Sequence, residues 1–459
     1  MWYRPLTLAQ LNALLRQVLR RAEVDRAVIF GVLTKIWQSL FALITVWLIA
    51  SYFTPELQGY YYTFVNLLAL QVFMELGLGI IIIQFASHEW SKLGLDKRGR
   101  IVGDPGALSR LVSLGRFALC WYSIAGGILS VGLVLGGYFF FSQLSSYPGI
   151  SWVGPWLILC LLTAMKLCFL PFWSLLEGCN QVSNVYFYRF INAIVIGVSL
   201  CAAIMLRVGL WAAGTAVACE LVWSGVFLFW RYRQFFNHFL SQPSGQRISW
   251  WSEIWQMQWR IALSWLSGYF IFSLFTPATF YYYGAAAAGQ MGMTWSLVSG
   301  LSGISSMWVL TKVPRFGVLI AQRKYEALDR LFFRSAAVSF IIACLGAIAI
   351  WVITYFLHFY NHPLSLRLLP SLPTGLFLLA TVLMQISYPQ SAYLRAHKKE
   401  PFLTVSVFQG ILTALSTLLL GSHFGATGMA VGYLGVIAFF VIPYGTVIWL
   451  RRRAEWHNP

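Results

Sequence analysis

The segment Pro55-Glu56-Leu57-Gln58-Gly59-Tyr60-Tyr61-Tyr62 opens an apolar stretch that runs on to Glu75-Leu76-Gly77-Leu78-Gly79. A similar segment, Ala285-Ala286-Ala287-Ala288-Gly289-Gln290-Met291-Gly292, opens a second apolar stretch that ends near Thr311. Gly59 and Gly289 lie 230 positions apart, about half of the 459 residues. Because similar segments at a fixed offset indicate internal duplication, the sequence predicts two homologous halves.

The composition indicates the class of protein. Hydrophobic residues make up 59% of the chain and charged residues only 10%, whereas charged residues make up about 25% of an ordinary soluble domain. Apolar segments of about 20 residues recur along the whole length, and each is long enough to cross a hydrocarbon core of about 30 Å. The sequence therefore predicts an all-α polytopic membrane protein.

The apolar segments predict about twelve transmembrane helices, which form two six-helix lobes. We place the spans near residues 28–51, 60–86, 115–142, 152–177, 184–206, 209–230, 260–282, 288–311, 335–358, 371–394, 402–421 and 427–450.

Basic residues alternate along the chain and predict its orientation. Lysines and arginines cluster before the first span, after every second span and at the C-terminus, whereas the other side holds only Arg207 and Arg367. Cytoplasmic segments of membrane proteins are enriched in these residues. We therefore expect a multi-pass protein of the cytoplasmic (inner) membrane with both termini in the cytoplasm. The net charge of +18 then reflects topology, and we expect no nucleic-acid partner.

The same pattern divides the chain into five segments. In the cytoplasmic N-terminus, leucine and valine recur at helical spacing from Leu8 to Leu19, which predicts an interfacial amphipathic helix. An N-lobe, a cytoplasmic linker with an interfacial helix, a C-lobe and a cytoplasmic tail follow. The predicted boundaries are 1–27, 28–230, 231–259, 260–450 and 451–459.

Two further pairs of segments support the duplication. The end of the fourth span, from Pro171 to Gly178, resembles the end of the tenth span, from Pro389 to Ala396. Likewise, the segment from Gly209 to Gly214 resembles the segment from Gly425 to Ala430. Since each half has an even number of spans, both halves share one orientation and are related by an axis along the membrane normal.

Four ionisable residues lie far from water. Lys35 lies about 10 Å deep in the first span at 1.5 Å per residue, and Glu75, Lys166 and Glu220 fall near the middles of spans two, four and six. Burying such a group costs at least about 2.5 kcal/mol, so each should face a partner or a wet cavity. We expect Lys35 and Glu75 to face a cavity. For Lys166 and Glu220, binding in a cavity and an internal ion pair that locks the bundle both stay open.

All four residues belong to the first half of the chain. The second half has only polar residues at mid-span, among them Gln290, Gln385, Tyr388 and Gln409. We therefore expect the charged part of a cargo to bind mainly one lobe. Arg189 and Arg260 lie at cytoplasmic ends of spans. Two roles explain them equally well: they could surround the cytoplasmic entrance of a cavity, or they could anchor the helices at the lipid headgroups.

The sequence resembles the multidrug/oligosaccharidyl-lipid/polysaccharide exporter superfamily, and within it the polysaccharide-export branch that includes O-antigen flippases. The resemblance covers nearly the whole chain and is carried by Phe53 to Tyr60, Glu75 to Leu78, and Gly289 to Arg315. It implies two six-helix lobes arranged in a V, alternating access and a central cationic cavity. The implied cargo is an undecaprenyl-diphosphate-linked oligosaccharide, flipped from the inner to the outer leaflet for surface polysaccharide biosynthesis. Membrane lipids and polysaccharide assembly proteins are the implied partners.

The resemblance also suggests roles for the ionisable residues. Lys35 is the best candidate for binding the diphosphate, because phosphate groups bind to cations. Arg189 and Arg260 are the next candidates. Glu75 and Glu220 are candidate sites for a coupling proton or sodium ion, since burial favours the protonated form of a carboxylate.

Two other functions compete with the flippase hypothesis. One is a cation-coupled multidrug antiporter of the same superfamily, in which Glu75 or Glu220 binds the ion. The other is an enzyme of polymer assembly, which would need a substantial outer loop that this chain lacks. The chain has no zinc-binding helix motif, phosphate loop or nucleophile elbow, so we expect neither an enzyme nor a bound cofactor.

Overall fold

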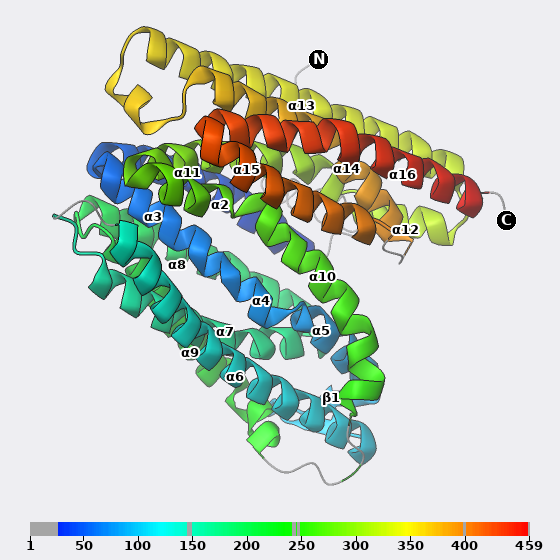
Figure 1. Cartoon of the computed structure of the whole chain (residues 1–459). Helices are drawn as coiled ribbons and strands as arrows, with labels where there is room; N and C mark the ends of the chain where they lie inside the picture. The colour runs from blue at the N-terminus through cyan, green and yellow to red at the C-terminus, as the bar shows by residue number, and fades with distance from the viewer. Residues whose placement is uncertain (1–25, 145–148, 241–244, 246–247, 398–400, 458–459) are drawn as a thin grey trace, which may run out of the picture.

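The computed structural model describes residues 26–144, 149–240, 245, 248–397 and 401–457. The predicted N-terminal amphipathic helix, from Leu8 to Leu19, lies outside these residues. The described chain is almost entirely helical, with one two-stranded hairpin, and it forms two helical bundles (Figure 1).

The N-lobe contains the first six spans. Its elements are α2 (Arg26–Tyr52), α3 (Pro55–Leu68), η1 (Ala69–Gln71), α4 (Val72–Glu75), α5 (Leu78–Trp90), β1 (Leu93–Leu95), β2 (Ile101–Gly103), α6 (Pro105–Leu144), α7 (Val153–Gly178), α8 (Val182–Met205) and α9 (Trp211–Asn237).

A linker and the C-lobe follow. Their elements are η2 (His238–Leu240), η3 (Trp250–Ile254), α10 (Trp255–Phe272), α11 (Phe275–Leu310), α12 (Val313–Ala321), α13 (Tyr325–Phe359), η4 (Pro363–Arg367), α14 (Ser371–Ala396), α15 (Leu403–Val436), η5 (Ile437–Val441) and α16 (Ile442–His457).

Two of the C-lobe helices turn back on themselves, and each contributes to two spans. Gly284 in α11 and Gly425 in α15 have φ angles of 83° and 60°, a region that favours glycine. Phe275 and Trp295, on either side of Gly284, bring their ring centroids within 4.8 Å. One crossing combines α10 with the first arm of α11, another combines the second arm of α15 with η5 and α16, and α3 to α5 form a single crossing. Counted in this way, the described residues contain the twelve predicted spans.

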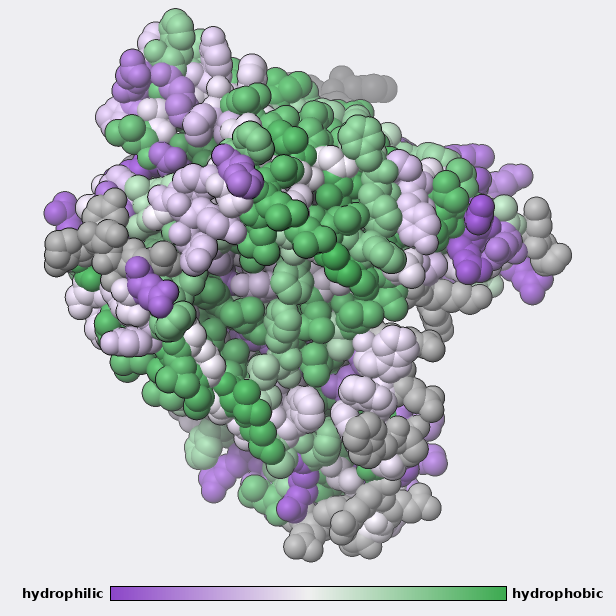
Figure 2. All heavy atoms as spheres, in the orientation of Figure 1, coloured by the Kyte–Doolittle hydropathy of each residue, from purple (hydrophilic) through white to green (hydrophobic). Residues whose placement is uncertain are grey.

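The surface and the interior match a membrane protein. Helix α6 exposes large apolar side chains along one side, such as Ile124, Ile128 and Leu135. Figure 2 shows an apolar surface across the middle of the molecule and hydrophilic residues gathered at its extremities. Inside, buried residues form two apolar clusters. One fills the N-lobe and extends into α11 at Phe280, Ala285 and Ala288, and the other lies within the C-lobe. The helices therefore bury one face in a lobe and leave the other for lipid.

We name the two ends of the molecule by their contents. The basic end holds the β1–β2 hairpin and the carboxyl ends of α9 and α16, and the opposite end holds the turns at Thr54, Gly209, Gly284 and Gly425. In Figure 1 the two bundles meet at the opposite end, where α3 lies beside α11, and diverge toward the basic end.

The contact between α3 and α11 has two-fold symmetry. A Cβ atom added to Gly59 would lie 1.8 Å from the Ala285 carbonyl oxygen, and one added to Gly289 would lie 2.8 Å from the Pro55 carbonyl oxygen. Gly59 and Gly289 lie 230 residues apart, and so do Pro55 and Ala285. The contact of Gly59 with Ala285 is therefore equivalent to the contact of Gly289 with Pro55. Such reciprocal contacts define a two-fold axis. The predicted duplication of two six-helix lobes is confirmed.

The other repeated segments also occupy equivalent positions. Pro171 and Pro389 both lie inside helices, in α7 and α14. Gly209 and Gly425, with φ angles of 64° and 60°, both lie at turns between the last two spans of a lobe.

The structure departs from the predicted spans at three places. The second span is broken between Glu75 and Leu78, where its two parts bend by 43°. The residues after it form the β1–β2 hairpin instead of an irregular loop. Around the predicted 231–259 linker, α9 continues to Asn237 and α10 begins at Trp255, so both helices extend beyond the apolar segments that predicted them.

Candidate functional site

A cavity of about 450 Å³ lies between the two lobes. The N-lobe contributes Lys35 from α2, and the C-lobe contributes residues of α10, α11, α14 and α15. Three serines of α11 line it at helical spacing, namely Ser299, Ser302 and Ser306, and aromatic rings such as that of Trp295 complete the wall. The cavity therefore combines an apolar wall with hydroxyl groups and one ammonium group.

Lys35 is the only charged residue among the described residues that line this cavity. Its side chain is exposed, and its Nζ donates a hydrogen bond to Gln38 Oε1 at 3.3 Å, one turn along α2. Its position, about ten residues into α2, brings this charge to the interface between the lobes. Lys35 thus lines the cavity, and its role in binding cargo stays a prediction.

Gln385 of α14 supplies the main polar contact on the C-lobe side. Its Oε1 accepts hydrogen bonds from Ser339 Oγ at 2.9 Å and Ser306 Oγ at 3.4 Å. Among the described residues its Nε2 has no hydrogen-bond partner, although the side chain is buried. Since an unpaired buried donor is costly, this amide is a candidate for bonding to a cargo acceptor.

Lys166 and Glu220 form an ion pair inside the N-lobe. Lys166 Nζ lies 2.9 Å from Glu220 Oε2, and Asn192 Nδ2 donates to Glu220 Oε1 at 3.1 Å. The Glu220 side chain is only 11% exposed, so the pair removes the cost of a buried unpaired charge. Of the two interpretations that the sequence left open, this contact matches the internal ion pair.

Glu75 lies at the break in the second span. Leu76 and Gly77 both adopt left-handed backbone angles, with φ of 48° and 67°. The break exposes carbonyl groups of the preceding helical turn; Trp121 Nε1 donates to one of them, Met74 O, at 3.3 Å. A Cβ added to Gly77 would lie 2.3 Å from Ile261 Cγ2 of α10, so the break packs against the helix that leads into the C-lobe.

Polar groups from two other helices, α6 and α7, lie near Glu75 around Gly79. A Cβ added to Gly79 would lie 3.1 Å from Ser174 Oγ, 3.4 Å from Glu75 Oε1 and 3.8 Å from the Tyr122 hydroxyl. The Tyr122 ring is fully buried. None of the ion pairs among the described residues involves Glu75. Unlike Glu220, this carboxylate therefore lacks a basic partner there.

Of the two predicted arginines, Arg189 and Arg260, the structure describes the side chain of Arg189 only. Arg189 Nη2 lies 2.6 Å from Glu177 Oε2, and its guanidinium group lies 4.9 Å from the centre of the Tyr186 ring. Arg260 belongs to α10, but its side chain lies outside the described part of the structure. The structure thus brings Lys166 together with Glu220, pairs Arg189 with an acid, and does not gather the candidates into one cluster. The lining serines of α11 were not predicted; their spacing of three and four residues was the available signal.

No group of three or more histidine, cysteine, aspartate or glutamate side chains in the described ranges is arranged to hold a metal ion. The interlobe cavity can instead bind an amphipathic molecule, because aromatic rings contact apolar parts while hydroxyl groups and Lys35 bind polar and anionic parts.

Repeated lobes with a cavity at their interface occur in many secondary membrane transporters. No protein-family profile matches the sequence, and no curated protein matches it. Solved structures do resemble the chain. An inward-facing multidrug resistance MATE family transporter of the MOP superfamily has a TM-score of 0.63 at 11% identity, over 94% of this chain and 95% of that one.

Two further structures give similar values. A MOP superfamily transporter from Pyrococcus furiosus, described as having a binding pocket of reverse polarity that suggests a different function, has a TM-score of 0.59 at 13% identity, over 95% of this chain and 96% of that one. An outward-facing MATE family transporter has a TM-score of 0.58 at 14% identity with the same coverage. The predicted fold of two six-helix lobes is confirmed. Likeness at these identities concerns the fold alone, and it does not support the O-antigen flippase branch.

Proposed function

We propose that this protein is an alternating-access transporter that moves amphipathic molecules across the membrane. The observation that carries the proposal is the cavity between the lobes, in which one N-lobe charge faces a polar C-lobe wall. At the opposite end, Gln58 Nε2 reaches across the lobe boundary to donate to Gly289 O at 2.7 Å. A cavity whose outer side is sealed by such contacts becomes a transport site when the lobes rock.

The cavity size favours a small cargo. A volume of about 450 Å³ lies within the range of about 300–1,000 Å³ that is usual for drug-sized ligands. The solved multidrug transporters of the same fold point in the same direction. We therefore favour a cation-coupled multidrug antiporter, and Lys35 leads us to propose that its preferred cargo carries an anionic group.

The second candidate is a flippase for an undecaprenyl-diphosphate-linked oligosaccharide. Lys35 is the specific observation in its favour, because a diphosphate entering between the lobes would meet this ammonium group. In this case the glycan would extend beyond the cavity, and polysaccharide assembly proteins would be partners.

For the coupling ion we propose Glu75 in preference to Glu220. Glu220 has Lys166 as its partner, whereas Glu75 lies without a basic partner among the described residues at a helix break that contacts α10. Binding of a proton or sodium ion there would change the charge at the contact between α10 and the N-lobe. We also propose that the basic end faces the cytoplasm, with both termini on that side of the inner membrane.

Transport into proteoliposomes tests the proposed function. Wild-type protein and the Lys35→Gln variant should be compared with fluorescent amphiphiles of matched size that carry a negative, zero or positive charge. We expect the variant to lose transport of the anionic probe by tenfold or more and to retain that of the neutral one. Lys324→Gln, an exposed charge at the basic end, is the matched control.

The same assay separates the two candidate functions. Ion-driven transport of drug-sized probes favours the antiporter, and movement of a diphosphate-linked oligosaccharide lipid without drug transport favours the flippase. Equal transport of all probes by wild type and Lys35→Gln would contradict the assigned role of Lys35.

A further inference from the structure

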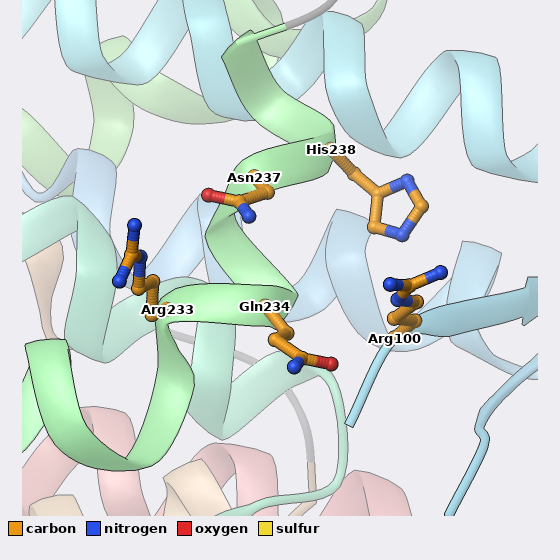
Figure 3. A pocket seen from close by; sticks show the side chains of 5 residues that line it. All are labelled: Arg100, Arg233, Gln234, Asn237 and His238. Carbon is orange, nitrogen blue, oxygen red and sulfur yellow. The ribbon is translucent and has the colours of Figure 1, made fainter. Parts of the chain in front are cut away.

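A second pocket, remote from the interlobe cavity, lies at the basic end of the N-lobe. It has a volume of about 430 Å³ and is lined by Arg100, Arg233, Gln234, Asn237 and His238, which we name the basic pocket. Figure 3 shows Arg100 reaching from the segment before β2 toward Gln234 and His238, while Arg233 and Asn237 lie along the other flank of the α9 end. Two cations from distant parts of the sequence therefore line one hollow, on opposite flanks of the α9 end.

The hairpin that carries Arg100 is held in a fixed geometry. Strands β1 and β2 pair in antiparallel register from Leu93–Gly103 to Leu95–Ile101. At the turn, the Asp96 carboxylate accepts hydrogen bonds from the backbone N–H groups of Arg98 and Arg100, each at 2.8 Å. One oxygen of Asp96 accepts both of these bonds and is therefore committed to the turn. Arg100 is thus preorganised without an ion-pair partner among the described residues.

The charge balance of the pocket favours an anion. The carboxyl end of α9 contributes about half a negative charge from the helix dipole. The two guanidinium groups outweigh this charge, and no salt bridge within the described ranges neutralises either of them. Guanidinium and amide N–H groups together match the oxygens of a phosphate group.

The neighbouring surface indicates where the phosphate comes from. A hollow of about 600 Å³ shares Arg233 and Gln234 with the basic pocket and also includes Phe229 and Trp230. Trp230 is 83% exposed and Phe229 58% exposed on the same helix, about one turn from Arg233. Exposed tryptophan beside a lipid-facing helix surface is typical of the headgroup region of a bilayer. This surface therefore favours a membrane lipid as the source of the phosphate.

We propose that the basic pocket binds the phosphate of an anionic membrane lipid, with the headgroup between Arg100 and Arg233 and an acyl chain along Phe229 and Trp230. A lipid bound there bridges the β1–β2 hairpin and the end of α9. This site is independent of the cargo of the interlobe cavity.

Native mass spectrometry of the full-length protein in detergent tests the proposal. Phosphatidylglycerol and phosphatidylcholine are titrated separately, and inorganic phosphate is added as a competitor. We expect at least one phosphatidylglycerol molecule to bind more tightly than phosphatidylcholine. Arg100→Gln and Arg233→Gln should each weaken that binding about fivefold, and the double variant about thirtyfold.

Control variants distinguish lipid binding in the basic pocket from nonspecific attraction of anionic lipids to basic surfaces. Arg330→Gln/Arg334→Gln removes the same charge from exposed positions of α13 and should leave binding unchanged. Arg100→Lys/Arg233→Lys should retain most of it. Equal losses in the α13 control, or equal binding of the two lipids, would overturn the proposal. Equal binding of the two lipids, together with binding of inorganic phosphate that Arg100→Gln/Arg233→Gln abolishes, would assign the pocket to a soluble phosphate instead.

Discussion

Gly59→Ala is predicted to shift the protein toward the state that is open at the opposite end. The added Cβ atom would lie 1.8 Å from the Ala285 carbonyl oxygen, whereas ordinary contact begins near 3.4 Å. Helices α3 and α11 must therefore separate by about 1.6 Å where they cross. When the lobes rock apart at this end the helices separate, and the methyl group has room. The substitution therefore raises the free energy of only one conformation, the one that is closed at the opposite end.

The size of the shift follows from the cost of overpacking. An extra methyl group in a tight contact typically costs about 1–3 kcal/mol. Taking about 2 kcal/mol, the ratio of the two conformations should change about thirtyfold. Gly300→Ala is the matched control, because the same substitution in α11 meets nothing within 4 Å.

Double electron–electron resonance can measure the shift. Spin labels at Leu206→Cys and Phe424→Cys in a cysteine-free background report the distance between the lobes at the opposite end, and both positions are exposed. Gly59→Ala should add a population at longer distance, and Gly300→Ala should not. A distribution unchanged by Gly59→Ala, or a loss of thermal stability without any new population, would refute rocking about this contact.

Three further substitutions test individual interactions. Lys166→Met should cost about 2 kcal/mol in unfolding assays, below the usual 3–5 because Lys166 is 36% exposed, and adding Glu220→Met should recover most of it. Gly425→Ala should cost about 1–2 kcal/mol, because a φ of 60° strains an L-residue, and a thermal melt will show it. A backbone N–H group and the Arg110 guanidinium lower the pKa of Glu253, so its contribution to stability is present above its unfolded pKa and is lost as pH falls through the folded pKa. Glu253→Gln should flatten the loss of stability on acidification, and melting temperatures that fall as steeply as in wild type would contradict this.

The sequence predicted the architecture because the required signals are long-range and redundant. Apolar length gives each span, and the Gly59 and Gly289 pair marks the helices that cross on the axis. The break after Glu75 was missed because Leu76 adopts a left-handed angle that nothing in its side chain favours. Tertiary contacts, such as the bond from Trp121 to the Met74 carbonyl, hold that conformation.

The candidate site was predictable only in part. Because burying a charge is costly, the sequence predicted that Lys35 faces a cavity. For Lys166 and Glu220 the same argument allowed either a position in a cavity or an ion pair, and it could not distinguish between them. That choice depends on which faces of α7 and α9 meet, and spacing within one helix does not determine it. The serines of α11 are common residues in membrane helices, so only the fold distinguishes them as cavity-lining.

The most direct test of the account is the accessibility of position 35 from the two sides of the membrane. Lys35→Cys in a cysteine-free background is labelled with a membrane-impermeant maleimide in vesicles of each orientation. We predict rapid labelling from the basic end, and labelling from the opposite end that rises when Gly59→Ala is added. Protection of position 35 from both sides, in both backgrounds, would contradict a central cavity that opens alternately.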